Sequence, residues 1–378
     1  MTPADLPRPG FGGGSLCDVL PAVLAGLQVP GDAGGMDLTV TSRVCLLLVD
    51  GLGAAALGAN PDAAPFLSSL RENAASRTIS SVFPSTTPIA LTSLGTGLGP
   101  GEHGITGLVI RLPEDGRLVN TLARPSEMDL RLLQPRPTVF ERAAEAGVTV
   151  TRVGPAVLRA DGLSDAGLRG GDYAAAESAG ELVVATAWAA ARSERSLTYT
   201  YYGQLDGTGH RQGCTSPAWL AELTHVDRLV EQLAAGLPAG VTLLVTSDHG
   251  MVDVPAENKW DVATNPALAA GVEVLAGDQR GAFVHTRRGA EGDVLDTWRE
   301  VLGDSFWVLS RDEAVSAGLF GPRVSDHVRG RIGDVVAAAR GNSAVLDSRH
   351  LSPTLLALVG MHGSLTSEEL QVPLLVHG

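Results

Sequence analysis

Three runs of strand length are each followed by side chains that could bind a metal ion. The runs and the polar residues after them are 44–49 with Asp50, 196–202 with Asp206 and His210, and 241–246 with Asp248 and His249. Carboxylate oxygens and imidazole nitrogens together suit Zn²⁺ or Mn²⁺. The residue types therefore predict a metal centre, provided that the fold brings the ends of the three runs to one place.

A largely parallel β-sheet would do this, because open α/β sheets bind ligands outside the carboxyl ends of their strands. The chain shows the required alternation of strands and helices. The expected strands are 44–49, 78–83, 148–153, 196–202, 241–246 and 372–376. The expected helices lie near 16–27 and 64–73, after the capping box Thr138-x-x-Glu141, and after Ser216-Pro217. Pro373 suggests that the last strand lies at a sheet edge.

Chain length limits the domain organisation. A chain of 378 residues, 44% of them hydrophobic, suits one large α/β domain with a subdomain, or two domains. We expect a single catalytic domain over residues 1–378. Within it, residues from about 255 to 345 have a less regular pattern, with Gly and Arg throughout, and are a candidate cap subdomain.

A threonine before a short helical segment is the candidate nucleophile. In the stretch SVFPSTTPIALTSLGTG, the pair Thr87-Pro88 is typical of an N-cap and a first helical residue, and the helix is expected to end at the glycines Gly95 and Gly97. A helix N-terminus favours an anion such as phosphate. A threonine hydroxyl needs a base or a metal ion to become a nucleophile, and the Asp and His residues could hold that ion.

The glycines after Asp50 offer a competing interpretation. Gly51-x-Gly53-x-x-Ala56 matches a dinucleotide-binding fingerprint. That motif should be followed by an acidic residue at the end of the next strand, and the corresponding stretch SVFPSTT has none. An oxidoreductase would also leave the later Asp and His residues unexplained.

Charge and cysteine content exclude several classes of protein. The net charge of −14 disfavours binding to nucleic-acid polymers or to anionic membranes, although a local metal ion would still attract a small anionic substrate. Cys17, Cys45 and Cys214 form no disulfide framework. The N-terminal stretch has no basic leader and no membrane span. We therefore expect a cytoplasmic enzyme.

The order of these motifs resembles the type I phosphodiesterase/nucleotide pyrophosphatase family of the alkaline phosphatase superfamily, from about residue 44 to residue 375. The resemblance implies an α/β fold with an alkaline-phosphatase-like central sheet, mixed but largely parallel and flanked by helices, plus a small cap. The nucleophilic Thr of that family follows Phe-Pro and precedes Thr-Gly. Phe83-Pro84 and Thr96-Gly97 place it at Thr87 without a gap, whereas Thr86 would require one.

The resemblance also implies two divalent metal ions, Zn²⁺ in the first place with Mn²⁺ as the alternative. One ion would be held by Asp50, Asp248 and His249 and would touch Thr87. The other would be held by Asp206, His210 and His362, the last of which lies in a His-Gly pair. Two such ions could stabilise the attacking and leaving oxygens of an in-line displacement. Thr87 would form a phosphothreonine, which water would then hydrolyse.

One position departs from the pattern of the family. Its nucleotide pyrophosphatases carry an Asn that binds a phosphoryl oxygen, and the corresponding residue here is Leu108. The predicted activity is hydrolysis of a small phosphate ester, of the phosphodiesterase or nucleotide pyrophosphatase type. A phosphomonoesterase and a phosphonate hydrolase are alternatives within the superfamily, and a catalytically silent metal-binding module is an alternative of another class. The sequence leaves the oligomeric state open.

Overall fold

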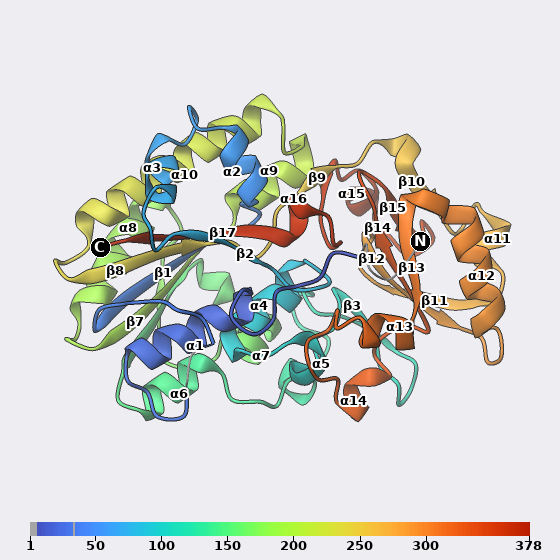
Figure 1. The fold of residues 1–378 in the computed structure, drawn as a ribbon, viewed down its shortest axis with the longest axis horizontal. Helices are drawn as coiled ribbons and strands as arrows, with labels where there is room; N and C mark the ends of the chain where they lie inside the picture. The colour runs from blue at the N-terminus through green and yellow to red at the C-terminus, as the bar shows by residue number, and fades with distance from the viewer. Residues whose placement is uncertain (1–5, 33–34) are drawn as a thin grey trace.

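The computed structural model describes residues 6–32 and 35–378, so the first five residues of the N-terminal stretch assessed above lie outside it. Its main feature is a seven-stranded sheet with the strand order β2-β17-β8-β1-β7-β5-β6 (Figure 1). In that order the strands are β2 (Arg77–Ser80), β17 (Gln371–His377), β8 (Val241–Thr246), β1 (Arg43–Val49), β7 (Ser196–Tyr202), β5 (Thr149–Gly154) and β6 (Asp172–Ala175). Among the described helices, none is both long enough and apolar enough to cross a bilayer.

The sheet is mixed but largely parallel, as the sequence predicts. β1 pairs in parallel with β7 and β8, and β5 pairs in parallel with β7 and β6. Only β17 runs against its neighbours β2 and β8. The carboxyl ends of β1, β7 and β8 therefore meet at one edge of the sheet.

The expected edge position of the last strand is wrong. β17 lies between β2 and β8, one strand inside the sheet. Pro373 lies opposite Thr78 of β2, and the pairing of β17 with β8 begins one residue later, at Leu374. Because this pairing starts after the proline, an interior strand can accommodate a residue that lacks an N–H group.

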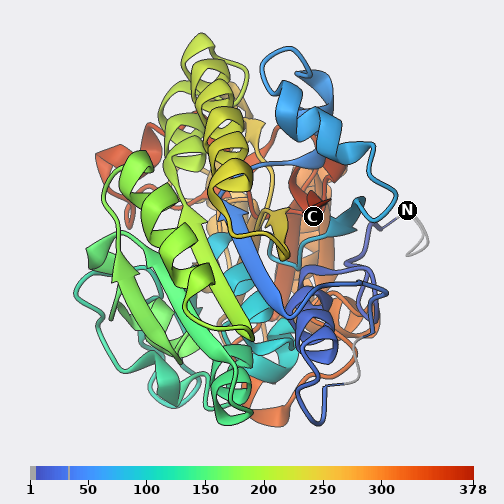
Figure 2. The same ribbon diagram turned by 90° about the vertical axis from the view of Figure 1, so that its left-hand side faces the viewer.

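Helices cover both faces of the main sheet, because the side chains of β1 alternate between two apolar clusters. Leu46 and Leu48 pack on one side, and Leu47 and Val49 on the other. The first cluster is covered by α1 (Leu16–Gly26), α4 (Thr87–Thr96), α6 (Val139–Glu145) and α7 (Gly162–Gly167). The second is covered by α2 (Ala54–Ala59), α3 (Pro65–Arg71), α8 (Ala179–Ala191), α9 (Gln204–Gln212) and α10 (Pro217–Gly236). The two sets lie on opposite sides of the sheet (Figure 1 and Figure 2).

Local signals explain how several of these helices begin. The capping box predicted before α6 is present: the Glu141 backbone N–H donates to Thr138 Oγ1, and the Thr138 N–H donates to the Glu141 carboxylate. At α10, the Trp219 N–H donates to the hydroxyl of the N-cap Ser216, and Pro217 occupies the first turn. The predictions of these two helix starts are confirmed.

A second, antiparallel sheet occupies the other half of the molecule (Figure 1). Its six strands follow the order β13-β14-β12-β11-β3-β4. They are β13 (Phe306–Ser310), β14 (Val335–Ala339), β12 (Gly281–Thr286), β11 (Val272–Gly277), β3 (Val109–Arg111) and β4 (Leu118–Asn120). Four of these strands, β11 to β14, come from residues 255–345, where the sequence pattern is less regular. Successive Val, Ala and Phe side chains of these strands alternate between the two faces of the sheet, and both faces are buried. The hairpin β3–β4 joins the sheet from outside that range.

Smaller elements surround this sheet. α12 (Glu291–Leu302) and α11 (Pro266–Ala269) pack on one face, and α13 (Arg311–Ser316) packs on the other. The strand pairs are β10 (Lys259–Asp261) with β15 (Ala344–Leu346), and β9 (Val252–Asp253) with β16 (Gly360–Met361). The remaining short helices are α5 (Pro100–His103), α14 (Asp326–Arg329), α15 (Pro353–Leu356) and α16 (Ser367–Leu370). The β9–β16 pair brings the segment after β16 close to the loop that follows β8.

Candidate active site

The carboxyl ends of β1, β7 and β8 deliver most of the sequence-predicted site residues. Asp50 directly follows β1, and Asp248 and His249 lie in the loop after β8. Asp206 and His210 both lie on α9, which begins soon after β7. Their spacing of four residues places them on one face of that helix. His362 comes from the segment after β16, and Thr87 is the first residue of α4.

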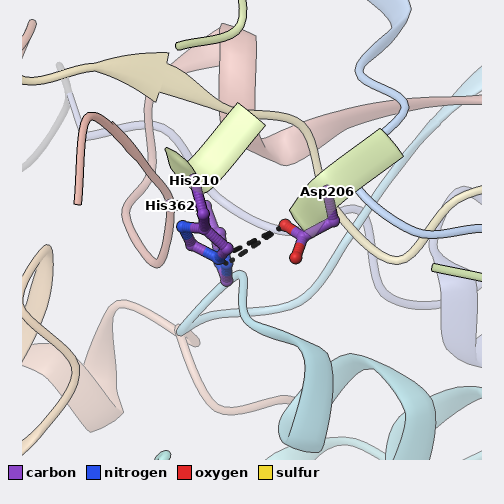
Figure 3. Close-up of side chains that lie close together, drawn as sticks. All are labelled: Asp206, His210 and His362. Atoms are coloured by element: carbon purple, nitrogen blue, oxygen red, sulfur yellow. Dashed lines mark hydrogen bonds and ion pairs between the residues drawn. The ribbon is translucent and has the colours of Figure 1, made fainter. Parts of the chain in front are cut away.

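Asp206, His210 and His362 form one group (Figure 3). The Asp206 Oδ1 atom lies 3.4 Å from His210 Nε2 and 3.7 Å from His362 Nε2, and the two Nε2 atoms are 3.2 Å apart. The Nδ1 atom of His210 lies 2.7 Å from the Gly360 carbonyl oxygen, and that of His362 lies 3.1 Å from the Ser85 carbonyl oxygen. A carbonyl at Nδ1 leaves Nε2 as the nitrogen that can bind a metal ion.

Asp50, Asp248, His249 and Thr87 form a second group next to the first. His249 Nε2 lies 3.5 Å from Asp50 Oδ1, 3.3 Å from Asp248 Oδ2 and 3.2 Å from Thr87 Oγ1. Asp50, Asp206 and His249 also present ligand atoms within 4.8 Å of one another. Asp206 thus belongs to both groups, which therefore form one continuous cluster.

The N-terminus of α4 differs by one residue from the prediction. Thr86 is the N-cap with an extended backbone, Thr87 is the first helical residue, and Pro88 follows it. Proline is tolerated here because N–H groups of the first turn have no partner within the helix. The shift leaves the Thr87 hydroxyl facing His249 rather than capping its own helix.

The sequence profile of one family, described as "Type I phosphodiesterase / nucleotide pyrophosphatase", matches residues 44–365. The chain belongs to this family. Its members are metal-dependent, and the chain is a phosphate-ester hydrolase of this type. A comparison with curated protein sequences gives no significant match.

Solved structures with the same fold include relatives from mouse and human. Murine ectonucleotide pyrophosphatase/phosphodiesterase 5 has a TM-score of 0.70 and 20% sequence identity, and the match covers 89% of this chain and 88% of that one. An inactive variant of the murine protein, in complex with AMP, gives the same values. The human protein has a TM-score of 0.67 and 18% identity over the same shares of the two chains. At these identities the likeness confirms the alkaline-phosphatase-like fold.

The electrostatics of this phosphodiesterase-type site call for a cation. Burial, followed by the charge of Asp50, raises the pKa of Asp206 to about 7. Burial, followed by the charge of Asp206, raises the pKa of Asp248 to about 7, and burial beside Asp248 raises that of Asp50 well above its usual value. Close carboxylates repel one another when both are ionised. A divalent ion among them would remove this penalty.

Polar atoms without hydrogen-bond partners also indicate that the site binds a cation. Asp50 Oδ1, Asp206 Oδ1 and Asp248 Oδ2 are buried and have no hydrogen-bond partner in the part of the chain that the structure describes. Burial lowers the pKa of His249 to about 4 and that of His362 well below its usual value, so both rings are neutral at pH 7. Neutral imidazoles and unpartnered carboxylate oxygens are the donor set of zinc sites. The residues fit the metal that the family requires.

Neighbouring groups fix these carboxylates in place. The Tyr201 hydroxyl donates to Asp50 Oδ2 at 2.6 Å, and the Gly51 backbone N–H donates to Asp248 Oδ1 at 3.2 Å. Gly51 has φ +78°, and a Cβ atom there would lie 3.0 Å from the Cα and Cβ atoms of Asp206. Glycine at position 51 therefore permits both the turn after β1 and the close approach of α9.

Sequence reasoning missed the substrate-side walls of the site. A cavity of about 160 Å³ next to Asp50, Thr87 and Asp206 is lined by aromatic and basic side chains. Those side chains, none of which the sequence singled out, are Arg124, Arg152, Tyr173, Tyr199 and Tyr201. The alternating tyrosines of SLTYTYY, and a charged residue inside an otherwise apolar strand, were the available signals. Leu108 is not among the lining residues, and its carbonyl oxygen accepts from the Thr121 N–H.

Proposed function

We propose that this chain is a two-metal phosphodiesterase of the nucleotide pyrophosphatase type that works through a phosphothreonine on Thr87. The observation that carries the proposal is the position of the Thr87 hydroxyl, 3.2 Å from His249 Nε2 and at the junction of the two Asp/His groups. Following the motifs of the family, one ion would be held by Asp50, Asp248 and His249. The other ion would be held by Asp206, His210 and His362. Zn²⁺ is the first candidate and Mn²⁺ the second.

Bound divalent ions would supply positive charge that favours the alkoxide of the nucleophile and offsets charge on the phosphoryl oxygens. Thr87 Oγ1 attacks phosphorus, a Thr87–phosphorus bond forms, and the bond between phosphorus and the leaving ester oxygen breaks. That oxygen leaves with a proton as an alcohol or a phosphate. Water then attacks phosphorus, and the Thr87–phosphorus bond breaks to release a phosphomonoester.

The neighbouring residues hold Thr87 ready for this attack. It lies in the first turn of α4, a ten-residue helix whose dipole favours a bound phosphoryl group at this end. Tyr201 and Gly51 restrain two of the carboxylates through their hydrogen bonds. The AMP-bound structure of the murine relative supports a nucleotide-type ester as substrate. We also propose that the second sheet acts as a cap and that the enzyme is cytoplasmic.

The proposal is tested with protein stripped of metal and reloaded with Zn²⁺ or Mn²⁺. Rates are measured on bis(4-nitrophenyl) phosphate, 4-nitrophenyl phosphate and a 4-nitrophenyl phosphonate ester. We expect the diester to react fastest and acid quenching to trap a 4-nitrophenyl phosphoryl group on Thr87. A faster monoester or phosphonate rate would move the assignment to the corresponding alternative, and bound metal without turnover would indicate a silent module.

Thr87→Ala and Thr87→Ser provide the matched pair. The Ala variant should lose at least about 10³-fold in kcat while keeping its metal, because the nucleophile is removed. The Ser variant keeps a hydroxyl and should retain measurable turnover and a trapped phosphoserine. Undiminished turnover of the Ala variant would overturn the role of Thr87.

A further inference from the structure

The cavity beside Thr87 is closed on one side by a row of three side chains from adjacent strands. Tyr199 of β7 lies opposite Arg152 of β5, and Arg152 lies opposite Tyr173 of β6. Residues in register on neighbouring strands point to the same face of a sheet. All three line the cavity, together with Thr87 and the two carboxylates Asp50 and Asp206.

Arg152 is a buried cation on which the charges of Asp161 and Asp165 act without forming an ion pair. Its exposed fraction is 7%, and its Nε atom has no hydrogen-bond partner among the described residues. In the described part of the chain no carboxylate forms an ion pair with it; its guanidinium instead lies 5.3 Å from the ring centre of Tyr173. Burial of an unpaired charge costs several kcal/mol unless a partner arrives. An arginine in this state, facing a cavity, is suited to bind an anion.

A second unpartnered donor faces the same cavity. The Tyr199 hydroxyl is buried and, within residues 6–32 and 35–378, has no hydrogen-bond partner. The other charged pair of the cavity wall is already satisfied, since Arg124 donates to Asp161 at 3.0 Å and Asp161 also accepts from the Ser164 N–H. Arg152 and Tyr199 are therefore the donors left for a ligand.

The remaining walls are apolar, and the cavity is small. Leu91, Leu122, Leu163 and Leu168 contribute to the lining. A cavity of about 150 Å³ in another protein holds one benzene molecule, so this one, at about 160 Å³, has room for a single ring. A ring between apolar walls could place a substituent against Arg152 and Tyr199.

We infer that Arg152 is a specificity residue that binds a carboxylate, or another anionic substituent, on a ring in the ester group of the substrate. Arg152 would form charge-assisted hydrogen bonds with the substituent, and the Tyr199 hydroxyl would donate another. This inference rests on the proposed function, because the phosphoryl group of the same ester must lie at Thr87. The substrate would then be recognised by charge at two points: its phosphoryl group at the metal ions, and its anionic substituent at Arg152.

Binding of product-like monoesters tests this inference without turnover. The zinc-loaded Thr87→Ala protein is titrated by calorimetry with phenyl phosphate, with 3- and 4-carboxyphenyl phosphate, and with the neutral 3- and 4-carbamoylphenyl phosphates. At least one carboxylate isomer should bind about tenfold tighter than phenyl phosphate, as expected for a charged hydrogen-bonded pair. The same titrations are repeated with Arg152→Met and Arg159→Met added separately.

Arg159 is the matched control because it contacts the same Tyr173 ring, at 5.6 Å, but is exposed and does not line the cavity. Arg159→Met should keep the carboxylate preference. Arg152→Met should lose the preference while still binding phenyl phosphate, and that residual binding shows that the variant is folded. A preference that survives in Arg152→Met, or is absent from the parent protein, would overturn the inference. Equal tightening by carbamoyl and carboxylate would overturn the assignment of an anion.

The two proposals fail separately. Loss of phosphothreonine formation in the enzyme with Thr87 intact would contradict the proposed function. A hydrolase that forms the intermediate but binds all five monoesters equally would contradict only the role of Arg152.

Discussion

The imidazole rings of His249 and His362 are stacked, with centroids 3.5 Å apart and an interplanar angle of 14°. The two residues belong to different Asp/His groups, so the stack joins the groups directly. Two cationic rings could not stack in this way without strong repulsion, and burial lowers the pKa of both rings below the usual range. Each ring has its Nδ1 atom 3.1 Å from a carbonyl oxygen, of Gly250 and Ser85 respectively. Their Nε2 atoms are thereby left for ligands.

Replacement of His362 should therefore affect metal binding by both groups unequally. In His362→Ala we expect loss of about one metal equivalent, from the group with Asp206 and His210. Affinity there should fall by more than about 100-fold, because even the outer partners of metal ligands are worth 10–100-fold. Elemental analysis after dialysis measures the stoichiometry. His225→Ala, at an exposed position on α10, should keep the full metal content. Equal metal content in both variants would contradict the ligand assignment.

Gly51→Ala should damage the site through packing. The new Cβ would meet Asp206 at 3.0 Å, and position 51 has φ +78°. A left-handed backbone costs a residue with a Cβ roughly 1–2 kcal/mol in any environment. Gly289, with φ +82° and no atom within 4 Å of its added Cβ, isolates this backbone cost. Denaturant unfolding should show a larger loss in Gly51→Ala than in Gly289→Ala, and only the former should bind metal more weakly. Similar losses with normal metal binding would rule out the packing argument.

Arg280→Met should be strongly destabilising. Arg280 and Glu369 form a fully buried ion pair at 2.6 Å, and Glu369 Oε1 accepts from the Ser364 N–H, close to His362. Removing one partner of a buried pair leaves an uncompensated charge, which costs about 3–5 kcal/mol. Breaking the exposed Arg228–Glu231 pair by Glu231→Gln should cost far less, because solvent already screens the two charges. Urea unfolding of both variants at one pH provides the comparison, and equal losses would contradict it.

Acid should destabilise the fold through His285. Burial, with a contribution from Arg111, lowers the pKa of His285 to about 4, whereas an unfolded histidine has a pKa near 6.5. The unfolded state therefore binds the proton first, and stability is lost as the pH falls from about 6.5 towards 4. At pH 5 the loss from this residue is about 2 kcal/mol. His285→Gln should remove that part of the pH dependence between pH 7.5 and 5, measured by urea unfolding. Parallel curves for the two proteins would refute the prediction.

The parts of the fold that sequence predicted best are the strands buried on both faces. β1 and β8 are runs with apolar residues on both sides, so little but a central strand of a largely parallel sheet can accommodate them. β6 went unnoticed because it is a four-residue edge strand with no buried residue. The segment with Asp206 and His210 contains Gly207 and Gly209, which weaken any helical signal, yet it forms α9. There Gly209 lies against Met251, where a Cβ atom would be only 2.4 Å from the sulfur.

The candidate site likewise contains residues that the sequence could place and residues that it could not. Asp50, Asp206 and Asp248 could be placed together because parallel strands end at one edge. His362 could be named only through the family motif, since β16 is a two-residue strand that no periodicity reveals. Arg152 could not be recognised from the sequence at all, because its lack of an ion-pair partner depends on side chains from three strands. Spacing along the chain indicates metal ligands better than it indicates what lines a substrate cavity.

The position of β17 has a consequence for biosynthesis. β2 and β8 are translated long before β17, yet neither can complete its pairing until β17 inserts between them. During synthesis both strands carry an open backbone edge, which is a template for unwanted association. The sheet is therefore completed late in synthesis. Until β17 has emerged from the ribosome, the open edge of β8 should need protection against association with other chains.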